Sequence, residues 1–364
     1  MGRILNLGVS AAAIVFVAAA AQTPLRTITA FSDRALTAST GKYLHDVSWS
    51  GADALLIATD LGVYRVNASG GTPKQVINNV PLPDGLPDPT ALASDGQSVS
   101  AISWNSNGGF ALRLGDRKRL EAQSSFRLIP MDVAVLGSRA CVVGFAPTPS
   151  SDVSKDAAVW CGSPSDSWRE LKPLHYIRDG HAKELFQNAP GSFGGRIAIE
   201  ADGTVDVITS AQPGVFRYAS NGTFKEVLGK SIDDLVLESM AEIRGRFAND
   251  LENRYRLLLN VQPVIDDLVV TPTGPAIVVR IAAGDKIHWE LWYPQRSGGV
   301  GDRLRLGIER IGPYGHLRCD ARGADLACAG SQPPRKEASS ARTAQAWPHL
   351  WLFHFPANVS NARR

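Results

Sequence analysis

Short apolar segments separated by tight turns recur through most of this chain. Residues 55–71 show the pattern, with LLIAT, an Asp-Leu-Gly turn, VYRV and then a pair of glycines. Runs of this length that are rich in Val and Ile and bounded by Gly, Asp or Asn are typical of antiparallel β-strands. One such sheet cannot bury both of its faces, so a chain that repeats it must pack several sheets against one another.

Each repeat contains four predicted strands. In the first repeat they are DVSWS, ALLIAT, VYRVNA and PKQVI, and the first strands of successive repeats begin near Asp46, Thr90, Asp132, Arg196, Asp267 and His316. Three of the spacings are 44, 42 and 49 residues, and the other two are 64 and 71. The shorter values are close to the length of a four-stranded propeller blade. The sequence therefore predicts an all-β fold, a six-bladed β-propeller of four-stranded antiparallel blades.

The last repeat is shorter than the others. GHLRC, DLACAG and HLWLFHF give it three strands, whereas PLRTITAF at 24–31 is a strand without a blade of its own. We expect residues 24–31 to supply the fourth strand of the last blade, because a closed ring has no exposed end sheets.

Two stretches carry a resemblance to known proteins. IATDLGVYRVNASGG and PMDVAVLGSRACVVGF resemble blades of secreted six-bladed propellers, the broad group that includes the NHL-repeat, SMP-30-like and TolB-like proteins. The likeness covers nearly all of the chain as a pattern, but it marks no subfamily. No functional residue is therefore transferred from any one family.

The N-terminus has the pattern of a secretory signal peptide. Residues 1–21 contain Arg3, then an apolar stretch, with small residues at a cleavage point near Ala20 or Ala21. The alternative is a membrane anchor, since residues 4–21 are about long enough to span. With cleavage, we expect one domain over 22–364 in the periplasm or outside the cell, with no further membrane span.

The cysteines form two close pairs, Cys141 with Cys161 and Cys319 with Cys328. In each pair the residues lie on predicted neighbouring strands, which favours two disulfides in an oxidising compartment. The alternative is four buried free thiols.

The charge balance argues against nucleic acid as a partner. The formal net charge is +3, from 38 basic and 35 acidic residues, so no strong field for a polyanion is expected. No catalytic motif occurs with its required spacing, which favours a binding role over catalysis and leaves enzyme activity open. We expect a monomer that binds an unidentified protein or small ligand.

Strand parity predicts which face of a propeller carries that role. Loops between second and third strands share one face with the connections from blade to blade, and loops carry function more often than the scaffold. We therefore expect a binding scaffold that works through this upper face.

Two long connections enlarge the upper face. The first, near 172–193, contains His175, Asp179 and His181, which could bind a divalent metal or could be an ordinary polar loop. The second, 231–263, has apolar residues at helical spacing and predicts a helical insertion between the fourth and fifth blades. This helix could be a lid on the propeller or a gate.

Three aspartates occupy the same place in alternate blades. Asp46, Asp132 and Asp267 lie just before the apolar part of the innermost strands, with His45, Asp266 and His316 nearby. A carboxylate ring at the central channel could hold Ca²⁺ or another divalent metal, as in a metal-dependent hydrolase or lactonase. The alternative, which needs no cofactor, is that these side chains accept local backbone N–H groups.

A third hypothesis is carbohydrate binding. The chain has eight tryptophans, and Trp104 and Trp347 lie next to predicted loops, where an indole ring could stack on a sugar.

Overall fold

A computed structural model describes sixteen stretches of the chain with gaps between them, and all structural statements below concern these residues. The described ranges are 25–36, 40–41, 44–78, 91–94, 99–104, 110–114, 118–121, 129–145, 159–163, 166–172, 195–209, 212–230, 264–283, 286–308, 316–331 and 349–355. The predicted signal peptide at 1–21 and the predicted helical insertion at 231–263 lie outside them.

The described strands form successive sheets along the chain. The first sheet contains β3 (Leu44–Trp49), β4 (Ala54–Thr59), β5 (Gly62–Asn67) and β6 (Lys74–Asn78). The second contains β7 (Ala91–Ser94), β8 (Val99–Trp104), β9 (Phe110–Leu114) and β10 (Lys118–Glu121). The third contains β11 (Ile129–Leu136), β12 (Arg139–Phe145), β13 (Val159–Ser163) and β14 (Asp166–Glu170).

The remaining sheets follow the same order. The fourth contains β15 (Gly195–Ile199), β16 (Val205–Thr209), β17 (Gln212–Tyr218) and β18 (Phe224–Leu228). The fifth contains β19 (Val264–Thr271), β20 (Gly274–Ala283), β21 (Lys286–Pro294) and β22 (Val300–Gly307), together with β1 (Arg26–Thr29). The sixth contains β23 (His316–Arg322), β24 (Asp325–Ser331) and β25 (His349–His354), together with β2 (Ser32–Ala35).

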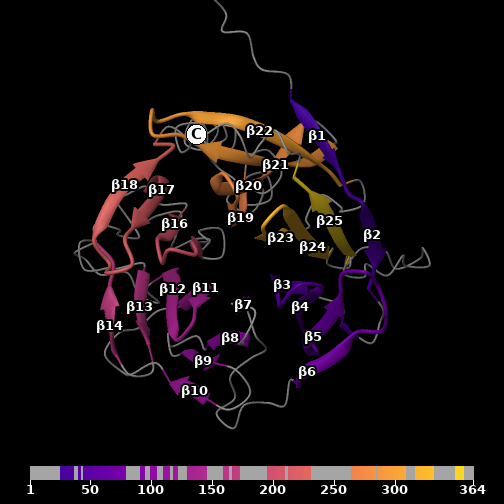
Figure 1. Ribbon diagram of the computed structural model, residues 1–364, viewed down its shortest axis with the longest axis horizontal. Coiled ribbons are helices and arrows are strands. Elements are labelled where there is room, and N and C mark those ends of the chain that lie inside the picture. Colours follow the sequence, from indigo (N-terminus) through magenta and orange to yellow (C-terminus); the bar gives the residue numbers. More distant parts are fainter. Residues whose placement is uncertain are drawn as a thin grey trace, which may run out of the picture.

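The sheets stand around a common centre, as Figure 1 shows. β3, β7, β11, β15, β19 and β23 are the innermost strands, and each contacts the next around the ring until β23 returns to β3. The protein is therefore an all-β propeller of antiparallel blades, and no α-helix occurs within the described residues.

The prediction of uniform four-stranded blades is wrong in one place. Five of the sheets have four antiparallel strands, but the fifth sheet has five, because β1 pairs in parallel with β22. The prediction that residues 24–31 close the last blade is also wrong, since β2 takes that place and pairs with β25.

The two halves of the N-terminal segment pair with different sheets because each half buries an apolar side chain in a different gap between sheets. Ile28 of β1 is buried in the cluster between the fifth and sixth sheets, whereas Leu36, just after β2, is buried between the sixth and the first. Between them the N–H of Phe31 donates to the carbonyl of Leu352 (2.8 Å). The segment therefore joins two sheets, and the ends of the described chain close the ring together.

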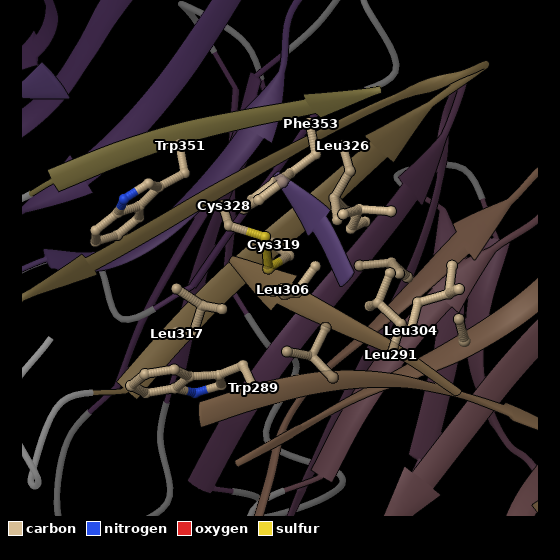
Figure 2. Close-up of a cluster of buried hydrophobic side chains, with 14 of the residues drawn as sticks. Trp289, Leu291, Leu304, Leu306, Leu317, Cys319, Leu326, Cys328, Trp351 and Phe353 are labelled. Carbon is tan, nitrogen blue, oxygen red and sulfur yellow. A yellow bond between two sulfur atoms is a disulfide. The ribbon is translucent and has the colours of Figure 1, made fainter. Parts of the chain in front are cut away.

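The core lies in the gaps between neighbouring sheets. Figure 2 shows one of these clusters, where Trp289 of β21 lies beside Leu317 of β23, and Trp351 and Phe353 come from β25. Each of these side chains is almost fully buried, and burial of one large apolar side chain stabilises a fold by about 1.5–3 kcal/mol. Apolar packing between sheets thus holds the propeller together.

Both predicted disulfides are present. Cys141 and Cys161 face each other across β12 and β13, and Cys319 and Cys328 across β23 and β24. All four cysteines are buried. Within the described residues we find no helix that is long and apolar enough to cross a bilayer.

Candidate functional site

A cavity of about 680 Å³ lies at the centre of the ring. All six innermost strands line it, and turn residues such as Ala52, Ala201 and Pro272 line one end. Aliphatic side chains including Val135 and Ile199 supply much of the wall. A volume of this size is within the range of small-molecule binding sites.

Three aspartates line the opposite end of the cavity. A β-bulge precedes each of Asp46, Asp132 and Asp267, on β3, β11 and β19. A bulge turns the strand locally and redirects the following side chain. The innermost strand of a sheet also has backbone groups without a neighbouring strand on its inner side, and these groups need other partners.

Each of these carboxylates bridges two sheets. One oxygen accepts the N–H of the next residue, at 2.8 Å for Val47, 2.8 Å for Val133 and 2.9 Å for Leu268. The other oxygen accepts an N–H of the following sheet, at 2.7 Å for Leu92, 2.9 Å for Ile197 and 2.7 Å for Cys319. The first, third and fifth sheets are therefore fastened to the second, fourth and sixth.

Asp320 extends the pattern from the sixth sheet to the first. Its Oδ2 accepts the N–H of Trp49 (2.7 Å) and the hydroxyl of Ser48 (3.0 Å). We call Asp46, Asp132, Asp267 and Asp320 the aspartate ring. Next to it, Oδ2 of the buried Asp266 accepts the indole N–H of Trp289 at 2.7 Å.

Two arginines balance part of this negative charge. Arg196 donates from Nε to the carbonyl of Asp266 (2.8 Å), and its Nε lies 3.9 Å from Oδ1 of Asp267. Arg318 donates from Nε to the carbonyl of His45 (3.2 Å) and from Nη1 to that of Asp266 (2.6 Å). Each arginine comes directly before the residue whose N–H a ring aspartate binds.

Burial raises the pKa of the ring carboxyls. It raises the pKa of Asp132 to about 6 and that of Asp320 to about 6. The pKa of Asp46 lies well above its usual value because of burial and then of repulsion from Asp132 and Asp267. Burial also raises the pKa of Asp267, against the opposing effect of the two arginines.

A second charged cluster lies on the fourth sheet. Arg217 of β17 donates to Asp206 of β16 (2.8 Å), to Glu226 of β18 (3.2 Å) and to Glu200. Glu226 in turn pairs with Arg296 in the β21–β22 turn of the fifth sheet (2.7 Å). We call these five residues the sheet-four ladder. Burial, followed by the neighbouring Glu200 carboxyl, raises the pKa of Asp206 to about 8.

The sequence-predicted residues divide into three groups. Asp46, Asp132 and Asp267 do come together at the central channel, where each accepts backbone N–H groups. The described residues contain no group of three or more His, Cys, Asp or Glu side chains that could hold a metal ion. Trp104 is the last residue of β8 and pairs with Phe110, so it stands at the end of a strand as predicted. The carbohydrate-binding role remains a prediction.

The other predicted residues cannot be placed. His175, Asp179, His181 and Trp347 lie outside the described residues. Of the neighbours predicted for the ring, Asp266 lies beside it, and the carbonyl of His45 accepts from Arg318.

Sequence reasoning missed Arg196, Arg318 and Asp320. A signal was present, because RI in GRIAIE and RC in HLRCD stand at the same position of the fourth and sixth repeats. The aspartates lie in the first, third and fifth repeats, and the arginines lie in the fourth and sixth. Aligning the odd-numbered repeats separately from the even-numbered ones would have shown both residue types at equivalent positions.

Comparison with known proteins supports the fold. No protein-family model and no curated protein matches the chain. A solved structure of a member of the DUF4221 family from Bacteroides vulgatus is similar, with 9% identity and a TM-score of 0.54, over 90% of this chain and 97% of that chain. This likeness shows the fold alone and agrees with the class that the sheets define, a β-propeller.

Two further solved structures are more distant. One is a calcium-binding protein, regucalcin, from Agrobacterium tumefaciens, with 12% identity, a TM-score of 0.48 and coverage of 91% of this chain and 97% of that chain. The other is a protein of unknown function from Bacteroides thetaiotaomicron, with 11% identity, a TM-score of 0.46 and coverage of 90% and 75%.

Proposed function

We propose that this protein is an exported binding protein that holds a small molecule in its central cavity. The main observation in support is the cavity of about 680 Å³, which is lined by strands from every sheet of the ring. The apolar wall provides the driving force for binding, and the polar end provides orientation. The two disulfides and the N-terminal pattern of residues 1–21 support export.

This proposal keeps the binding role that the sequence suggests but moves the site. The upper-face connections near 172–193 and 231–263 lie almost wholly outside the described residues, whereas the cavity is built from described strands. The ring carboxylates are occupied by backbone N–H groups that fasten the sheets together. We therefore favour a binding role over a metal-dependent hydrolase, because no observation in the described residues specifically supports the hydrolase.

Obstruction of the cavity tests the proposal. Ala52 and Ala201 are exposed turn residues of the first and fourth sheets, and both line one end of the cavity. We expect the double variant Ala52→Trp/Ala201→Trp to fold normally, because neither side chain is part of the core, and to lose ligand binding. The matched control, Leu61→Trp/Lys230→Trp, places the same two side chains on exposed positions of the same sheets away from the cavity.

The measurement is a fragment library screened by ligand-observed NMR and by thermal melting. We expect compounds that bind and stabilise the wild-type protein and the control but not the obstructed variant. A library without any binder, or binders that the obstruction does not affect, would refute the proposal.

A further inference from the structure

The central cavity has an excess of negative charge along its walls. Among its described lining residues, the acidic side chains are the four members of the aspartate ring, and the basic one is Arg322. Arg322 is exposed at the end lined by turns, with its guanidinium 5.7 Å from the centre of the Trp49 ring. Asp46, Asp132 and Asp267 therefore make the end opposite the turns acidic. Asp320, which accepts the N–H of Trp49, lies nearer to Arg322.

Neighbouring groups balance this charge only in part. Among the residues that the structure describes, Arg196 and Arg318 are the cations beside the ring, and Asp266 adds a further buried carboxyl next to them. In a site with little water, an unbalanced charge acts over a longer distance than in bulk solvent. A ligand that carries a positive charge would remove part of the imbalance.

The repeat shows which positions beside the aspartate ring carry an arginine. Arg196 in the fourth sheet and Arg318 in the sixth each donate from Nε to the carbonyl just before a ring aspartate of the next sheet, Asp267 or Asp46. The equivalent residue of the second sheet is Ala91, which precedes Leu92 as Arg196 precedes Ile197. A methyl group cannot reach the third sheet, so the described part of the second sheet gives Asp132 no arginine.

We infer that the ligand of the central cavity is an organic cation, a primary amine or a guanidinium on an apolar body, with its charged end toward the aspartate ring. This inference rests on the proposed function. The aliphatic wall accommodates the apolar body, and the ligand supplies positive charge as Arg196 and Arg318 do in the fourth and sixth sheets. Each carboxylate oxygen of Asp46, Asp132 and Asp267 accepts one backbone N–H and keeps a further acceptor site for the ligand. Carboxylates bind such groups through charge-assisted hydrogen bonds.

Three probes of one shape and different charge test the inference. Benzylamine, benzyl alcohol and benzoate share a ring and differ in the sign of the charge. We expect the wild-type protein at about pH 8 to bind benzylamine at least about tenfold more tightly than benzyl alcohol, which corresponds to about 1.4 kcal/mol, and to bind benzoate least. At about pH 5 the preference should shrink, because protons then neutralise the ring carboxyls.

A variant tests the position. Ala91→Arg adds the third guanidinium and should lower benzylamine affinity about tenfold without changing the affinity for benzyl alcohol. Ala91→Met adds similar bulk without charge and serves as its control. If both variants fail to fold, the charge series and its pH dependence in the wild-type protein decide the question alone.

The outcomes separate the two proposals. If benzyl alcohol binds as tightly as benzylamine, and Ala52→Trp/Ala201→Trp abolishes both, the cation inference is overturned and the binding function stands. If none of the three probes binds, the cation inference is also overturned, and the fragment library then decides the binding function.

Discussion

The aspartate ring and the sheet-four ladder are both clusters of charged side chains, but the charges act differently in each. In the ring, each carboxylate accepts backbone N–H groups of two neighbouring sheets, as Asp267 does with Leu268 and Cys319. In the ladder, side chains on facing strands pair with each other, as Arg217 does with Asp206. The ring therefore fastens sheets together, whereas the ladder mainly stabilises pairing within one sheet.

The difference follows from where each cluster stands. The ring lies on the innermost strands, whose backbone N–H groups have no neighbouring strand on one side. The carboxylates therefore serve as the acceptors for these N–H groups. The charges of the sheet-four ladder stand opposite one another in register, Asp206 with Arg217 and Arg217 with Glu226. Cross-strand pairs of opposite charge are favourable in that geometry.

The largest expected effect is the removal of a ring carboxylate. Asp267→Ala leaves two backbone N–H groups without an acceptor and removes the carboxylate beside the buried Arg196. We expect a loss of about 3–5 kcal/mol in the free energy of unfolding. Urea unfolding followed by tryptophan fluorescence measures it. The control is Asp325→Ala, because Asp325 lies on the same ring of sheets but is partly exposed and pairs with the exposed His354. A similar loss in both variants would show that the ring does not fasten the sheets.

The next effect is the dependence of stability on pH. A carboxyl whose pKa is raised in the folded state binds protons more tightly there than in the unfolded chain, so its stabilising effect is complete at low pH and is lost as pH rises through the folded pKa. For Asp132 and Asp320 this loss ends near pH 6, and for Asp206 it continues to about 8. These groups should therefore make the protein more stable at about pH 5 than at about pH 8.

Two variants separate the ring from the ladder in this experiment. Asp206→Asn should reduce the slope of unfolding free energy against pH between about 6 and 8, whereas Asp132→Asn should reduce it only below about 6. Each group contributes at most about 1.4 kcal/mol per pH unit. Urea midpoints measured at several pH values check this, and equal slopes in all three proteins would contradict the assignment.

Much of the fold follows from the repeat, and the exceptions have physical causes. The spacing of Val- and Ile-rich segments predicts the strands because short antiparallel hairpins depend on local turns such as that of Asp202. The fifth strand of the fifth sheet was not predictable, since the division at Phe31 depends on which gaps bury Ile28 and Leu36. Such burial is set by partners that are distant in the sequence.

The candidate site was predicted in part for the same reason. The three aspartates at equivalent positions indicated a ring, but the choice between metal ligands and backbone acceptors depends on the N–H of Leu92 or Ile197 in the next sheet. The amino-acid sequence also gives no sign of the β-bulge that precedes each aspartate. Equivalent positions in the repeat predict that the three aspartates lie close together. Whether their carboxylates bind a metal or backbone N–H groups depends on how the neighbouring sheets pack.

The smallest expected effect is at the outer end of the ladder. Arg296 pairs with Glu226 of the neighbouring sheet, but its side chain is 80% exposed, whereas that of Arg217 is 13% exposed. We expect Arg296→Ala to lower the free energy of unfolding by less than about 1 kcal/mol, because water and salt screen an exposed ion pair. High salt should remove this small difference from the wild-type protein in urea unfolding. A loss comparable to that of Asp267→Ala would instead mean that the ladder also fastens sheets to each other, and the contrast between the two clusters would fail.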